Sequence, residues 1–389
     1  MTTVYERNPP AGPGVHVLAI GVGRYPHLIG GVGPLTNNPL GLAQLSSPPV
    51  SVKAVADWFL ASLVAPGPSG FTNGTTSLGS VEALASAEGP ISVNAPAGAV
   101  QLEPATKENI QDAFERWLAR IVTDDANIGV FYFCGHGLMV ADHYLLAEDF
   151  GRSNAVPWEK AFDMSNTVRA VERDAKGALF FFVDACREVS KDVALTLGAN
   201  PLALKAVDLR KPVVRTSTSI VEATGEGKLA FAVEGKVSRF TEALLTAMSG
   251  YCGVRGPGSP TWDADGETIA GAVRKLLEKG NKTAKRRQVS DQTISGDSVP
   301  LLRLTTAPLV KVELDLLPEP MRAFARMYLL SAKGVKHDHE GANGAFVTEV
   351  PRGMYAVGAT ALAKEFGDLL FDEQDLIPPL FGLTMQAQP

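Results

Sequence analysis

The sequence predicts an α/β domain over residues 1–304, followed by a small, β-sandwich-like domain over residues 305–389. Apolar runs of strand length, such as residues 178–183, alternate with amphipathic helical patterns, and these runs are almost continuously apolar. Such strands are typical of a mostly parallel sheet that helices cover on both faces. In the second domain apolar and polar residues alternate instead, most clearly in residues 310–316, which indicates half-buried strands.

The individual elements follow from the same patterns. Apolar runs predict strands at residues 15–20, 128–133, 178–183, 213–219 and 299–304. Apolar residues at helical spacing predict helices around residues 52–63, 106–121, 165–173, 238–248 and 268–277. Thr106 suits the start of the second helix because its hydroxyl can accept a hydrogen bond from the first turn. Strands of the second domain are expected at residues 310–316, 324–330 and 344–360.

The stretch from about residue 64 to residue 105 has a different composition. It is rich in Gly, Ser, Ala and Pro, and its charged residues are Glu82, Glu88 and Glu103. Clusters of these small residues and prolines are typical of loops. We therefore expect an irregular surface insertion here.

Composition limits the classes of function. The chain has 36 basic and 42 acidic residues, a net charge of −6, so attraction to nucleic acid or to an anionic membrane is not expected. Three cysteines cannot all pair within the chain, which favours a reducing compartment. The longest apolar runs have the length of a strand. We therefore expect a cytoplasmic protein without a membrane span.

Two strand ends carry the residues that indicate chemistry. His136 follows the apolar run at residues 128–133, and Cys186 follows the run at residues 178–183. The carboxyl ends of parallel strands meet at one edge of a sheet, so the two side chains can face the same crevice. An imidazole that accepts the thiol proton makes the cysteine a better nucleophile. The backbone amides of Gly137 and Cys186 are candidates for an oxyanion hole.

Several residues allow other interpretations. Cys134 precedes His136 by two residues, but no further cysteine or histidine stands at metal-ligand spacing, so a core cysteine is favoured. His143 could compete with His136 as the base, although its place before an apolar strand favours a structural position. The pair His337 and His339 is expected in a solvated turn. No metal, nucleotide or other cofactor site is expected, because the chain lacks a phosphate-binding glycine motif.

The two motifs together resemble the caspase and metacaspase cysteine peptidases. Phe131-Tyr-Phe-Cys-Gly-His-Gly137 stands about 50 residues before Asp184-Ala-Cys-Arg-Glu188, the spacing known for the caspase His and Cys. Weaker similarities are Ile20-Gly-Val-Gly-Arg-Tyr25, Tyr144-Leu-Leu-Ala-Glu-Asp149 and Arg239-Phe-Thr-Glu-Ala-Leu-Leu245, and together they cover residues 15–304. The resemblance implies a caspase-like fold and a cysteine endopeptidase with a Cys186 and His136 dyad. It also implies regulated proteolysis in bacterial defence or cell death, with a regulatory protein as partner.

The resemblance also implies a cleavage preference. In caspases the residue two before the nucleophile lines the pocket for the substrate side chain that precedes the scissile bond. An acid at that place, Asp184, suits Arg or Lys. Metacaspase-like chains often have a second pocket Asp at the start of the first helix, where this chain has Ser51. Calcium dependence stays open, and a catalytically silent adaptor that binds partner proteins is the alternative function, against which the intact Cys186 and His136 argue.

The stretch after the nucleophile contains candidate sites of self-cleavage. In caspase-like enzymes this linker borders the active site and is often cut during maturation. An enzyme that prefers basic residues could cut after Lys205, Arg210 or Lys211, although Pro212 disfavours the last of these. An uncut loop in a single-chain enzyme is the alternative.

Overall fold

The computed structural model describes residues 3–8, 12–64, 70–139, 142–187, 201–224, 235–282, 284, 287–362 and 367–387. The chain forms two compact units. The first comprises Met1–Ser249 and Asp263–Arg303, and the second comprises Gly250–Trp262 and Leu304–Pro389. Each unit is described by itself.

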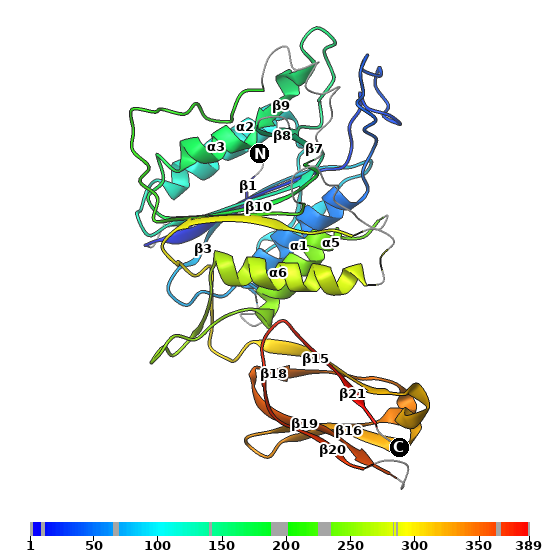
Figure 1. Cartoon of the computed structure of the whole chain (residues 1–389). Coiled ribbons are helices and arrows are strands. Elements are labelled where there is room, and N and C mark those ends of the chain that lie inside the picture. The colour runs from blue at the N-terminus through cyan, green and yellow to red at the C-terminus, as the bar shows by residue number, and fades with distance from the viewer. Residues whose placement is uncertain are drawn as a thin grey trace. The chain divides into compact units, whose positions relative to one another are not determined.

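A mixed, mostly parallel sheet forms the centre of the first unit (Figure 1). In spatial order its strands are β1 (Thr3–Glu6), β3 (Ser77–Ser86), β2 (Gly14–Val22), β6 (Ile128–Gly135), β10 (Ala178–Ala185), β11 (Ser217–Glu222) and β13 (Asp291–Gly296). The strands from β3 to β11 run parallel, and β1 and β13 pair with them in antiparallel orientation. This confirms the α/β class that the apolar runs predicted.

Helices cover both faces of this sheet. Figure 1 shows α2 and α3 on one face and α1, α5 and α6 on the other. Their bounds are α1 (Ser47–Ala61), α2 (Lys107–Ile121), α3 (Met164–Val171), α5 (Arg239–Thr246) and α6 (Gly266–Asn281). All residues of β6 and β10 are buried, as expected for strands that are covered on both faces.

The ends of the helices follow their capping residues. Thr106 accepts a hydrogen bond from the Asn109 N–H at 3.2 Å, as its sequence predicted. Asp163, Ser238 and Asp265 accept equivalent bonds at the starts of α3, α5 and α6. These caps satisfy N–H groups that lack a partner within the helix.

Several short elements occur in addition to those of the central sheet and its helices. They are β4 (Ser92–Ala95) with β5 (Gly98–Gln101), β7 (Gly137–Met139) with β8 (His143–Leu146) and β9 (Ala161–Asp163), and β12 (Trp262–Ala264) with β14 (Leu302–Leu304). Single 3-10 turns occur at Pro157–Lys160, Glu319–Phe324 and Gly341–Asn343, and a π-helical turn at Ala247–Tyr251 follows α5.

The prediction of an irregular insertion at residues 64–105 is wrong for the central part of this stretch. Ser77–Ser86 forms β3, which lies inside the sheet between β1 and β2 and is buried from Leu78 onward. Glu82 is also buried, because Arg116 and Arg120 of α2 neutralise its carboxylate. Small residues are therefore packed here rather than solvated, and a loop-like composition concealed a core strand.

Two strands of the sheet differ from their predicted ranges. The strand expected at residues 213–219 begins only at Ser217 and continues to Glu222. The edge of the sheet is β13, a largely exposed and polar strand, whereas Leu302–Leu304 pairs with β12 outside the sheet. An edge strand buries little side-chain area, so its sequence carries no apolar run.

The second unit consists of two facing sheets. One has the order β18 (Phe346–Pro351), β15 (Leu309–Leu317) and β21 (Leu380–Gln386), and the other has the order β17 (Lys336–Glu340), β16 (Ala325–Ser331), β19 (Gly353–Ala361) and β20 (Leu369–Leu376). Alternate residues such as Val310, Val312 and Leu314 form its core. The turn expected at His337 and His339 is instead strand β17, in which the His339 ring stacks on Phe346.

Candidate active site

The register of two neighbouring strands brings His136 and Cys186 to one edge of the sheet. Asp184 of β10 pairs with Cys134 of β6, and Ala185 pairs with Gly135. His136 and Cys186 are the next residues on these two strands. Adjacent parallel strands lie about 4.8 Å apart, so the backbones of these two residues are neighbours at this edge of the sheet.

The surroundings of His136 fix the orientation of its ring. Its backbone N–H donates to the Tyr25 hydroxyl at 2.9 Å, and its ring centre lies 4.8 Å from that of Tyr25. Its Nε2 lies 2.7 Å from the backbone carbonyl oxygen of Ala43. A carbonyl only accepts hydrogen bonds, so Nε2 carries the proton and Nδ1 keeps the lone pair. The ring can therefore accept a proton at Nδ1.

Burial makes this imidazole neutral. It lowers the pKa of His136 from its ordinary value to about 4, and the Ala43 carbonyl offsets only a part of that change. A neutral imidazole is the form that can act as a base. Close packing also explains why a glycine precedes His136. A Cβ at Gly135 would lie 2.9 Å from the Tyr25 hydroxyl oxygen.

The Gly137 N–H is directed away from its neighbouring strand. Leu146 donates its N–H to the His136 carbonyl at 3.1 Å, and Gly137 pairs with Leu145 in the next position of the ladder. Bonded and non-bonded pairs alternate in an antiparallel ladder, so the Gly137 amide is not used by β8. A side chain is excluded here, since a Cβ would lie 2.7 Å from the Cys186 carbonyl oxygen.

His143 lies next to the backbone of Cys186. Its ring is buried, with Nδ1 3.0 Å from Glu222 Oε1 and Nε2 3.2 Å from the Cys186 carbonyl oxygen. Glu222 also binds Arg187, whose Nη1 lies 2.8 Å from Oε2. The sequence analysis missed this chain of contacts, which joins residues far apart in sequence.

Asp184 is buried among hydroxyl groups. Its Oδ2 accepts hydrogen bonds from Ser238 and from Thr241, the latter at 2.7 Å, and the Cys134 thiol lies 3.5 Å away. Burial raises the pKa of the Asp184 carboxyl above its ordinary value, and the hydroxyl donors partly oppose this effect. The partners of this carboxylate among the described residues are thus neutral hydroxyl and thiol groups. A buried carboxylate in this state would gain from a cationic partner.

Ser51 lies next to the same group of side chains. It is fully buried on α1, and its Oγ accepts the Ser238 N–H at 3.0 Å. Since Ser238 also donates to Asp184, the structure links Ser51 and Asp184 through one residue. Cys134, the expected core cysteine, is buried and completes this cluster.

The candidate cleavage sites lie in a segment without regular secondary structure. Lys205 and Lys211 both form ion pairs with Asp174, at 3.0 and 2.7 Å, and Arg210 pairs with Asp208. The earlier part of the predicted linker, residues 188–200, lies outside the described residues. In the part of the chain that the structure describes, no group of three or more His, Cys, Asp or Glu side chains could hold a metal ion.

The fold and the strand-end residues together define a class of protein. A sequence model of the family described as caspase domain matches residues 79–297, more than half of the 389 residues. The chain therefore belongs to the caspase-domain family of cysteine peptidases, as the motifs around His136 and Cys186 indicated. The matched range contains both motifs but begins after the strand at residues 15–20, which the resemblance had included.

The chain is also similar to a bacterial relative and to a solved structure. The chain is 35% identical over 322 residues to the uncharacterized protein y4kE of Sinorhizobium fredii. The aligned region covers 79% of this chain and 92% of that protein. A solved structure, protein GSU0716 of Geobacter sulfurreducens, is 14% identical with a TM-score of 0.43 and covers 75% of this chain and 97% of its own. Among the described residues, no helix is both long and apolar enough to cross a membrane.

Proposed function

We propose that the protein is a cysteine endopeptidase that cleaves protein substrates after Arg or Lys. The observation that carries this proposal is the pairing of β6 with β10, which sets His136 beside Cys186 while Ala43 holds the imidazole with Nδ1 unprotonated. Family membership supports protein substrates. Regulated proteolysis in defence or cell death, under the control of a partner protein, is the proposed context.

The chemistry requires one nucleophile and one base. Nδ1 of His136 takes the proton from the Cys186 thiol as Sγ attacks the scissile carbonyl, and the carbonyl oxygen becomes an oxyanion. The N–H groups of Gly137 and Cys186 stabilise this charge. His136 then gives the proton to the leaving amine as the C–N bond breaks. Water, activated by the same imidazole, hydrolyses the thioester and restores the thiol.

Asp184 is the proposed origin of the basic preference. Side chains along a strand alternate between the two faces of the sheet, so Asp184 and Cys186 point to the same side. A substrate guanidinium or ammonium would compensate the buried carboxylate, whereas an acidic side chain would add a second buried negative charge. Ser238 and Thr241 hold the carboxylate in place. Ser51 supports this arrangement through Ser238.

Turnover of fluorogenic peptides that differ only in the residue before the cut tests the proposal. Wild-type protein is expected to hydrolyse the Arg and Lys peptides and to leave the Asp and Gln peptides intact. Cys186→Ala should abolish turnover without lowering the melting temperature, because a small residue is replaced by a smaller one. A folded wild-type protein with no turnover on any peptide would instead favour the silent adaptor.

A further inference from the structure

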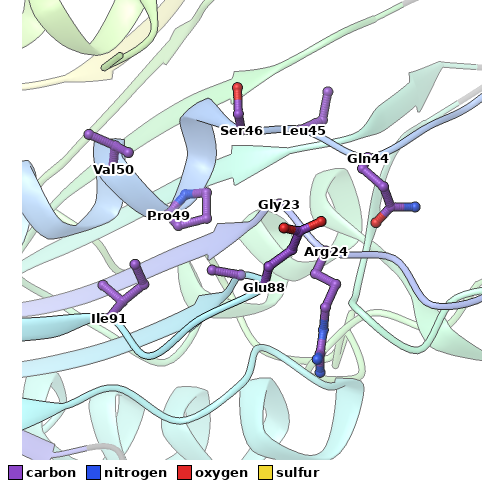
Figure 2. A pocket seen from close by; sticks show the side chains of 10 residues that line it. Gly23, Arg24, Gln44, Leu45, Ser46, Pro49, Val50, Glu88 and Ile91 are labelled. Atoms are coloured by element: carbon purple, nitrogen blue, oxygen red, sulfur yellow. The ribbon is translucent and has the colours of Figure 1, made fainter. Parts of the chain in front are cut away.

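A pocket of about 490 Å³ opens at the carboxyl ends of β2 and β3. Figure 2 shows its lining, which comes from the end of β2, the loop before α1, the first turn of α1 and the segment after β3. The lining includes Arg24, Leu45, Pro49, Val50, Glu88 and Ile91.

The wall of this pocket belongs to the loop that orients the base. Ala43, whose carbonyl binds His136, directly precedes Gln44 of the pocket lining. The Gln44 side chain accepts the Tyr25 N–H at 2.7 Å and donates to the Tyr25 carbonyl at 2.9 Å. Leu45 donates its N–H to the Gly23 carbonyl at 2.8 Å. The pocket is therefore rigidly connected to the catalytic base.

The strand order places the pocket on the leaving-group side of the site. Along the sheet, Cys186 follows β10, His136 follows β6, and the pocket lies at the ends of β2 and β3. His136 must protonate the leaving amine, so the substrate segment after the scissile bond extends past His136 towards β2. Asp184 and its partners on α5 lie with the segment before the bond.

Elementary spacings identify the substrate residues within reach. A scissile bond between the ends of β10 and β6 lies about 1.5 strand spacings from β2 and about 2.5 from β3, or roughly 7 to 12 Å. An extended peptide advances about 3.4 Å per residue. The second and third residues after the bond therefore reach the pocket.

The chemistry of the lining selects the side chain. Leu45, Pro49, Val50 and Ile91 supply apolar surface. The charge of Arg24 is neutralised by Glu148, to which its Nε donates at 3.0 Å. Glu88 is an exposed acidic residue, and Figure 2 shows its carboxylate among the lining side chains. An aliphatic side chain gains from burial here, and an acidic one is repelled.

We propose that this pocket binds the side chain of the second or third residue after the scissile bond and selects an aliphatic residue there. The inference rests on the proposed peptidase function, and it adds a specificity determinant on the other side of the cut from Asp184. Internally quenched peptides with Arg before the cut, and with Leu, Ser or Asp at the second and third following positions, measure the selection. A peptidyl aminomethylcoumarin with the same Arg ends at the cut and reports the chemistry alone.

We expect wild-type enzyme to prefer Leu over Ser by about tenfold in kcat/KM, which corresponds to about 1.4 kcal/mol, and to cleave the Asp peptide more slowly still. In the double variant Val50→Ala with Ile91→Ala, the ratio of Leu to Ser, normalised to coumarin hydrolysis by the same variant, should fall to about one third or less. Val122→Ala makes the same change as Val50→Ala at an exposed position at the end of α2 and should keep the wild-type ratio.

The two levels of inference fail differently in this experiment. Wild-type enzyme that releases coumarin but cleaves the Leu, Ser and Asp peptides equally overturns the pocket and leaves the peptidase intact. An unchanged ratio of kcat/KM between the Leu and Ser peptides in the double variant would also overturn the pocket proposal and leave the peptidase intact. Wild-type enzyme that cleaves neither substrate overturns the proposed function, and the pocket inference falls with it.

An independent observation concerns His143, which has an acceptor at each ring nitrogen. The Glu222 carboxylate faces Nδ1 at 3.0 Å, and the Cys186 carbonyl faces Nε2 at 3.2 Å. Both partners are acceptors, so any N–H that the imidazole carries is donated to the Glu222 carboxylate or to the Cys186 carbonyl oxygen. Arg187, the residue after the nucleophile, binds the other oxygen of Glu222 at 2.8 Å. The two residues Cys186 and Arg187 are thus held through one carboxylate.

We infer that His143 is a positioning residue that fixes the backbone of Cys186 and, with it, the oxyanion amide. His143→Ala is expected to lower kcat by about ten- to a hundredfold and to change KM by less than about threefold, because the interaction acts on the transition state. His143→Gln, which can still donate to the carbonyl, should restore a part of the lost kcat. The dependence of the remaining kcat on pH should keep the shape that it has in the wild type.

A comparison with His136→Ala distinguishes positioning from base catalysis. Iodoacetamide should still alkylate Cys186 in the His143→Ala variant, because His136 remains to accept the thiol proton, whereas alkylation at neutral pH should slow strongly in His136→Ala. Complete loss of both turnover and alkylation in His143→Ala would show that His143 is the base. If a folded His143→Ala variant kept the wild-type kcat, His143 would have neither a positioning role nor a role as the base.

Discussion

The imidazole Nε2 of His136 lies 2.7 Å from the backbone carbonyl oxygen of Ala43, a residue 93 positions earlier in the chain. This contact supplies the third component of the proposed catalytic unit, since it fixes both the ring orientation and the tautomer of the base. A carboxylate in this place would stabilise a protonated imidazole, whereas a neutral carbonyl does so only weakly. The base is therefore set up as a neutral group.

The pH dependence of catalysis should report this arrangement. Burial lowers the pKa of His136 to about 4, so the unprotonated base is present above that pH and is lost as the pH falls through it. We expect kcat/KM to decline on the acid side with a midpoint near pH 4 to 5, rather than near the ordinary histidine value of about 6.5. Initial rates on an Arg peptide between pH 3.5 and 8, with a parallel check of folding, measure this limb. A midpoint at 6.5 would contradict a base whose pKa is lowered by its surroundings.

Substitution of Asp184 should change specificity more than stability. Asp184→Asn removes the charge but keeps an oxygen that can accept from Ser238 or Thr241. We expect kcat/KM on Arg and Lys peptides to fall by roughly thirtyfold to a thousandfold, equivalent to about 2 to 4 kcal/mol. The melting temperature should stay close to that of the wild type. Asp208→Asn, in the segment before β11, is the matched control and should retain full activity; equal activity of both variants would exclude Asp184 from the specificity pocket.

The motifs at His136 and Cys186 could be recognised in the sequence because each follows a buried strand, and parallel pairing then determines that they meet. Ala43 could not be found in this way, since a backbone carbonyl leaves no residue signature. The contact of His143 with Glu222 depends on a pairing across 79 residues, for which one sequence contains no signal. Strand β3 was missed because its Gly, Ser and Ala residues resemble a loop, although Glu82 within it is buried against α2.

The burial of Glu82 allows a direct test of whether β3 is a core strand. Its carboxylate binds Arg120 at 2.7 Å and Arg116 at 3.2 Å, and it accepts the Thr3 hydroxyl at 2.7 Å. Glu82→Ala leaves these cations without their buried partner, which typically costs about 3 to 5 kcal/mol. Glu88→Ala, at an exposed position of the same stretch, should change the free energy of unfolding by less than about 0.5 kcal/mol. Urea titration of both variants decides the matter, and equal effects would support an irregular surface segment.

The three candidate cleavage sites after the nucleophile differ in how firmly the chain holds them. Lys205 follows Leu204, which is only 4% exposed and whose backbone N–H donates to Thr167 at 3.0 Å. Cleavage there would require Leu204 to leave the core. The Arg210 side chain, in contrast, is 91% exposed and pairs only with the nearby Asp208 within the described residues.

Self-processing should therefore occur after Arg210. The bond that follows Arg210 joins it to Lys211 in an exposed turn, where the Lys211 N–H donates to the Asp208 carbonyl at 3.1 Å, and this single turn can open without disturbing the core. Cleavage after Lys211 is disfavoured because Pro212 follows. On incubation, wild-type protein should yield fragments that end at Arg210 and begin at Lys211, as mass spectrometry can establish, and Cys186→Ala should stay intact. Arg210→Gln should prevent the cut, whereas Lys205→Gln should not. An active preparation that remains uncut between residues 201 and 216 would rule out processing in this segment as the switch and leave a single-chain enzyme.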